Sequence, residues 1–122
     1  MRKAKYSDSF QRFFEAYLVC ALGISTDGDT PLDKNHTVED IAPETKAKME
    51  ADCKAFFKKN SRLFKGQNGN AGHDFWLTRN GHGCGFWDGS WLKHGERLTE
   101  ACKAFGECEL YVGDDGKIYS CR

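Results

Sequence analysis

The side chains best suited to chemistry are concentrated in one segment of the second half of the chain. It runs from His73 to Gly89 and reads HDFWLTRNGHGCGFWDG. Histidine and aspartate can bind a metal or move a proton. Aromatic rings favour burial or a flat ligand, and glycine allows close approach of the backbone. The composition therefore indicates where a functional site lies, while leaving the chemistry of that site open.

Metal binding is the first chemistry that this segment could support. Zinc accepts histidine, cysteine and carboxylate ligands, and Cys84 lies in the same segment. The spacing matches neither a zinc finger nor an HExxH helix, and histidines in a turn more often bond to the backbone. We therefore expect no metal and no cofactor, and the candidate ligands are His73, Asp74, His82 and Asp88.

Acid–base catalysis is the second possibility, because a hydrolase needs a histidine–carboxylate pair that lines a pocket. Asp74, His82 and Asp88 could supply such a pair, and Arg79 could hold an anion. The alternative is that Asp74 pairs locally and Arg79 ends a strand in solvent. A small metal-dependent hydrolase thus remains an alternative, and a non-enzymatic protein is favoured.

Phosphate and nucleic-acid binding have mixed support. The glycines at 81, 83 and 85 are not followed by the Lys-Ser/Thr of a Walker loop or by the helix of a Rossmann fingerprint. Eighteen basic and eighteen acidic residues give no net charge, whereas duplex-DNA binders usually carry a basic excess. Aromatic rings flanked by Arg79, Lys93 and Arg97 could still stack single-stranded bases. A basic cluster over 54–65 is either a solvated helix face or an edge that contacts phosphate.

Hydrophobic periodicity predicts the elements of the first half. One apolar stripe with helical spacing comprises Phe10, Phe13, Phe14, Tyr17, Leu18, Ala21 and Leu22. Residues 25–35 have the composition of a loop. Thr37 and Asp40 form an approximate capping box, and Pro43 suits the first turn of a longer helix. The apolar face of that helix comprises Met49, Cys53, Phe56, Phe57, Leu63 and Phe64.

The second half is predicted to contain a sheet and one helix. Residues 67–72 are expected to form a flexible loop, 74–79 a strand, and 85–88 its returning partner after an Asn80-Gly81 turn. A helix of about ten residues is expected to end at Gly106. Residues 109–112 and 117–120 are expected to form a hairpin around a Gly-Asp-Asp-Gly turn.

Together these elements predict a single α+β domain over residues 1–122, with a helical half at 1–66 and a sheet-plus-helix half at 73–122. The expected order is α-α-β-β-α-β-β, with about three helices covering a small antiparallel sheet of about three to four strands.

The six cysteines are expected to be free thiols in a cytoplasmic protein. No pair has CxxC spacing, and Cys20, Cys53 and Cys102 fall on the apolar stripes of predicted helices. A bridge between Cys108 and Cys121, which flank the last hairpin, stays open. The basic N-terminus is better explained by an amphipathic helix than by a signal peptide, and no apolar run is long enough to span a membrane.

Several strings in the sequence resemble small uncharacterised proteins of tailed bacteriophages and their prophages. The strings are HDFWLTRNGHG, GFWD, GERLTEACKAFGE and LYVGDDGKIY, and the resemblance extends over most of the chain from about Phe14 onward. It implies no activity and no catalytic residue. It implies a phage product in bacterial cytoplasm, which also agrees with reduced thiols, and it favours an accessory role in the host.

The favoured function is therefore an accessory protein that binds a host or phage protein, such as a component of a defence system, and inhibits or redirects it. The alternative is a module that binds single-stranded nucleic acid or a nucleotide signal; the sequence leaves the oligomeric state open. The expected contact surface is the glycine-rich turn plus the tryptophans that remain exposed. Its candidate residues are Trp76, Arg79, Asn80, Gly81, His82, Gly83, Trp87 and Trp91.

Overall fold

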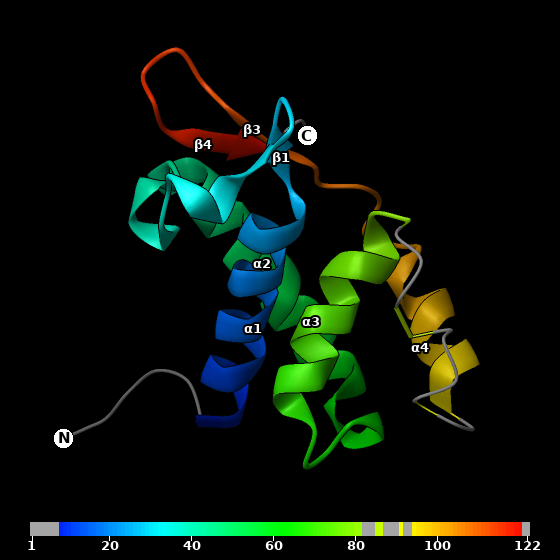
Figure 1. The fold of residues 1–122 in the computed structure, drawn as a ribbon. Coiled ribbons are helices and arrows are strands. Elements are labelled where there is room, and N and C mark those ends of the chain that lie inside the picture. Colours follow the sequence, from blue (N-terminus) through cyan, green and yellow to red (C-terminus); the bar gives the residue numbers. More distant parts are fainter. Residues whose placement is uncertain (1–7, 82–84, 87–90, 92–93, 121–122) are drawn as a thin grey trace, which may run out of the picture.

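The computed structural model describes residues 8–81, 85–86, 91 and 94–120, and four helices make up most of this part of the chain. Helices α1 (Asp8–Ile24) and α3 (Asn68–Arg79) lie side by side, and α2 (Pro43–Asn60) packs behind them (Figure 1). Helix α4 (Gly95–Cys102) contacts both α2 and α3. Two short β-hairpins lie at one end of this helical body (Figure 1).

Helix α1 confirms the periodicity predicted for it. Every residue of the predicted stripe in α1 is buried. Helix α2 confirms its own in part: Met49, Cys53 and Phe56 are buried, whereas Leu63 and Phe64 lie beyond its end at Asn60. The capping box is also present: Thr37 Oγ1 accepts a hydrogen bond from the Glu39 backbone, and the Thr37 backbone donates to Asp40. This box caps a short 3-10 turn, η2 (Val38–Asp40), and the longer helix α2 begins separately at Pro43. A second such turn, η3 (Ser61–Leu63), follows α2.

The segment predicted as a loop over 67–72 and a strand over 74–79 is instead helix α3, so both predictions are wrong. Nearly every residue from Ala71 onward is buried, because α1 covers one side of the helix and residues 85–86, 91 and α4 lie against the others. A helix that is buried all round shows no amphipathic period. The apparent alternation over 74–79 was therefore not a strand signal.

Glycine allows α3 to approach its neighbours closely. A Cβ on Gly72 would overlap the carbonyl oxygen of Phe13 in α1, and a Cβ on Gly85 would overlap Thr78 Oγ1. Gly85 and Phe86, which were predicted to begin a returning strand, lie in a bend and a turn, and residues 87–88 are outside the described part. The close packing of α1 on α3 thus depends on the missing side chain at position 72.

In the part of the chain that the structure describes, the strands form two separate two-stranded sheets rather than one sheet of three to four strands. Strands β1 (Thr26–Asp27) and β2 (Thr30–Pro31) pair within the segment that was predicted to be a loop, and a 3-10 turn, η1 (Leu32–Lys34), follows them. Strands β3 (Leu110–Val112) and β4 (Ile118–Ser120) form the predicted C-terminal hairpin. Ile41 adds a parallel bridge to Ile118 in β4.

The observed order is α1-β1-β2-α2-α3-α4-β3-β4, and the class is α+β, as expected. The finer prediction of a sheet covered by helices is wrong, because the helices pack mainly on one another. Their shared core is rich in phenylalanine, and Phe56 of α2 stacks on Phe75 of α3 with ring centroids 4.2 Å apart. Among the described helices, none is both long and apolar enough to cross a membrane.

Candidate functional site

Arg79, predicted to be part of a contact surface, is instead an internal connector. Its guanidinium donates to Asp52 Oδ2 at 2.9 Å and to the Tyr17 hydroxyl at 3.2 Å. It also donates to the carbonyl oxygens of Phe105 and Gly106, at 2.9 and 2.8 Å. The side chain is 0% exposed. One residue of α3 thereby joins α1, α2 and the segment after α4.

The charge of Arg79 is retained in this interior position. Burial alone would lower the pKa of Arg79, but its interactions with Tyr17 and Asp52 outweigh that cost and raise the pKa above its ordinary value. The rings of Phe75 and Phe105 lie 5.5 and 5.8 Å from the guanidinium carbon and add cation–π attraction. All of these contacts are within the chain, so Arg79 has a structural role.

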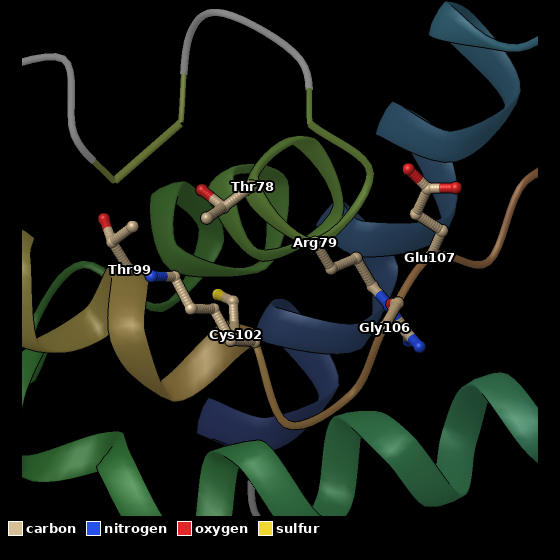
Figure 2. A pocket seen from close by; sticks show the side chains of 7 residues that line it. Thr78, Arg79, Thr99, Cys102, Gly106 and Glu107 are labelled. Carbon is tan, nitrogen blue, oxygen red and sulfur yellow. The ribbon is translucent and has the colours of Figure 1, made fainter.

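A small cavity of about 260 Å³ lies beside Arg79, between α3 and α4 (Figure 2). Two of its lining hydroxyls already have partners: Thr99 donates to the Gly95 carbonyl, and Thr78 accepts from the Phe86 backbone. Burial raises the pKa of the Cys102 thiol. The described residues that line the cavity therefore present neither a thiolate nor a free guanidinium to a ligand.

Asp74, a candidate metal ligand and a candidate carboxylate of a histidine–carboxylate pair, also makes its contacts within the fold. Its Oδ2 accepts from the Trp91 indole at 2.6 Å, and its Oδ1 lies 2.9 Å from His73 Nδ1. Asp74 and Trp91 are buried, whereas the His73 side chain is 52% exposed. The carboxylate thus ties the chain near residue 91 to α3.

The remaining predicted site residues fall into two groups. Trp76 and Asn80 are buried; the Asn80 side chain accepts from the Cys108 backbone at 2.6 Å, and Gly81 is exposed with a φ of 75°. His82, Gly83, Trp87 and Asp88 lie outside the described residues. The side chains of Trp76, Trp91 and Arg79 therefore do not form the exposed patch that was predicted. Within the described part, no group of three or more metal-ligating side chains converges.

The four cysteines in the described part of the chain are free and buried: Cys20, Cys53, Cys102 and Cys108. Burial, with a smaller contribution from Asp74, raises the pKa of Cys20 to about 12. Burial also raises the pKa of Cys53. Cys121, whose bridge to Cys108 the sequence left open, lies outside the described residues together with Cys84. The four buried thiols behave as packing groups.

A first exposed feature is the hairpin face, which comprises Tyr111, Val112, Asp114, Asp115 and Tyr119. These residues line an open hollow of about 640 Å³. The rings of Tyr111 and Tyr119 stack at 5.9 Å, and Tyr111 is 47% exposed. The Tyr119 hydroxyl donates to Asp115 at 2.7 Å, and this bond raises the pKa of Tyr119 to about 12. The face combines flat rings with negative charge.

A second exposed feature is the α2–α4 groove, a cavity of about 550 Å³ between the end of α2, η3 and α4. Among the described residues that line it, the cations are Lys59, Arg62 and Arg97, and the carboxylate is Glu100. The sequence pointed to Lys59 and Arg62 as a possible phosphate-contacting edge, but it did not place Arg97 beside them. That placement depends on the packing of α4 against α2.

In comparisons with known proteins, no family model, no curated protein and no solved structure matches the chain.

Proposed function

We propose that this chain is a phage accessory protein that acts in bacterial cytoplasm by binding a partner protein and inhibiting or redirecting it. The observation that carries the proposal is which side chains are buried in the fold and which are exposed to solvent. The residues with the chemistry of a reaction centre, Arg79 and Asp74, are hydrogen-bonded inside the fold. The tyrosine rings of the hairpin face are among the large side chains that meet solvent.

The hairpin face has the composition of a protein contact. Tyrosine is enriched among the residues that contribute most of the energy of an interface. The stacked pair is held in place by strand pairing of Tyr111 with Tyr119 and by the hydrogen bond from Tyr119 to Asp115. The two side chains therefore lose little conformational entropy when a partner binds. Asp114 and Asp115 add negative charge. The partner is therefore expected to present lysine or arginine side chains at this contact.

Affinity capture of the tagged chain from phage-infected or lysogenic bacteria, followed by reconstitution from purified components, tests this proposal. We expect one partner protein in a defined ratio and a Kd that rises by at least about tenfold for Tyr111→Ala, because a buried interface tyrosine contributes about 2 kcal/mol or more. Val19→Ala is the matched control, since Val19 is a 65% exposed apolar side chain on α1. Equal affinity of both variants, or absence of a stoichiometric partner, would contradict the proposal.

The other functions weighed from the sequence have less support in the geometry. The metal-dependent hydrolase was predicted on His73, Asp74, His82 and Asp88, of which His82 and Asp88 lie outside the described residues. Both carboxylate oxygens of Asp74 have partners within the chain, which leaves Asp74 less available to a metal or a substrate. Stacking of nucleic acid on Trp76 and Trp91 would require exposed indoles, and both residues are buried. Neither function is favoured by an observation at those residues.

A further inference from the structure

We propose that the α2–α4 groove is a binding site for a phosphate-bearing ligand of nucleotide size. This inference goes beyond the protein contact proposed for the hairpin face and involves different residues. It rests on the charge, volume and lining of one cavity. The lining residues are Ala55, Lys59, Asn60, Arg62, Arg97, Glu100, Ala101, Ala104 and Phe105.

Charge in the groove is unbalanced toward the positive. Lys59, Arg62 and Arg97 are all exposed, and none of them makes an ion pair with another described residue. By contrast, Glu100 is already bonded to Lys103 at 2.9 Å. Two of the three free cations are arginines, whose planar fork matches two oxygens of one phosphate group. The groove therefore offers forked donors without a competing internal acceptor.

The shape of the groove suits a small ligand. Its volume of about 550 Å³ lies within the range of about 300–1,000 Å³ typical of small-molecule sites. Three alanines leave room along the lining. The half-buried Phe105 ring is held by edge contacts with Phe56 at 5.9 Å and Phe75 at 5.3 Å. The apolar part of the site is thus preformed and can contact a flat group such as a nucleobase.

Glu100 distinguishes a nucleotide from an acidic peptide. A carboxylate beside the cations repels a segment that carries negative charge along its whole length. Lys103 bonds to Oε2 of this carboxylate, so the other oxygen, Oε1, can accept a hydrogen bond from a sugar hydroxyl or an exocyclic amine. A ligand with a phosphate at one end and neutral donors at the other satisfies Lys59, Arg62, Arg97 and Glu100 together, and this is the polarity of a nucleotide.

Calorimetric titration of the full chain at low salt tests the assignment, with ATP, adenosine, inorganic pyrophosphate, a short oligothymidylate and a polyglutamate peptide as probes. We expect ATP to bind more tightly than adenosine, with an affinity that falls as salt rises. Arg97→Gln and Arg62→Gln should each weaken ATP binding by about tenfold or more, since a charge-assisted hydrogen bond contributes about 1.5–3 kcal/mol. Arg12→Gln, an exposed arginine on α1, is the control and should bind as the unaltered chain does.

Preferential binding of the oligothymidylate, with the same sensitivity to Arg62 and Arg97, would support the phosphate site and identify nucleic acid as the source of the phosphate. Binding of no phosphate probe, equal loss in the Arg12 variant, or preference for polyglutamate would overturn the proposal. Circular dichroism of each variant separates loss of the site from loss of the fold. Tyr111→Ala should leave ATP binding unchanged, so failure of the protein contact and failure of this site are distinguishable.

Discussion

At the scale of single residues, the side chains that looked most reactive hold the structure together. Arg79 makes four hydrogen bonds to three different segments, and Asp74 accepts from Trp91. Their residue types were chemically suggestive in the sequence, yet the distances that define their roles involve partners far away along the chain. Composition identified important residues without identifying what they do.

Removal of the Arg79 guanidinium should strongly destabilise the fold. Arg79→Met leaves two backbone carbonyls without their donor and leaves Asp52 with Lys48 as its remaining cation, so we expect the free energy of unfolding to fall by about 3–5 kcal/mol. Arg79→Lys should also be destabilising, because one ammonium cannot reproduce the forked geometry. Denaturant unfolding measures both effects.

Lys103→Met is the control for Arg79, because the Lys103 side chain forms an ion pair with Glu100 and is 69% exposed. An exposed pair of this kind contributes no more than about 1 kcal/mol. If Arg79→Met and Lys103→Met had similar unfolding midpoints, the connecting role of Arg79 would be wrong.

At the scale of elements, whether the apolar pattern predicted a helix correctly depended on how many of its faces are buried. Helix α1 has one buried and one solvent face, so its apolar stripe predicted it correctly. Helix α3 is buried nearly all round, and its residues suggested a loop and a strand. The start of α2 at Pro43 and the C-terminal hairpin followed from local turn and capping chemistry, which needs no tertiary partner.

Two glycines of α3 should respond to alanine in opposite directions. A Cβ on Gly72 would overlap the Phe13 backbone, so Gly72→Ala should push α1 and α3 apart and cost about 1–3 kcal/mol of stability. Nothing lies within 4 Å of the corresponding position on Gly69, so Gly69→Ala should stabilise the helix by up to about 1 kcal/mol. Thermal melting of both variants makes the comparison, and a gain for Gly72→Ala would refute the close approach of the two helices.

At the scale of the whole molecule, equal numbers of acidic and basic residues conceal an uneven surface. The hairpin face carries Asp114 and Asp115, whereas the α2–α4 groove carries Lys59, Arg62 and Arg97. A net charge of zero therefore does not rule out a local positive surface that could bind an anionic ligand. The two surfaces that we propose for a cationic partner and for an anionic ligand differ in charge, although the chain as a whole is neutral.

Stability of the whole domain should decline at alkaline pH. Burial and Asp74 raise the pKa of Cys20 from 9.0 to about 12 in the folded protein, and burial also raises the pKa of Tyr17. A thiol with a raised folded pKa favours folding below the pKa of the unfolded chain, and that contribution is lost as pH rises from about 9 towards 12. Denaturant unfolding at a series of pH values should show this decline.

Cys20→Ala should make the alkaline decline shallower without abolishing it, because Tyr17 and the other buried thiols still titrate. An identical dependence on pH in the variant and the unaltered chain would show that Cys20 does not carry the effect.

The sequence by itself determined the α+β class, helix α1, the start of α2, the last hairpin and the buried thiols, because these follow from local periodicity, caps and turns. Only the tertiary structure decided that α3 is a helix, that Arg79 and Asp74 point inward, and that Arg97 lies in one groove with Lys59 and Arg62. The physical reason is that burial on all sides removes the periodic signal, and contacts between distant segments leave no pattern in either segment alone.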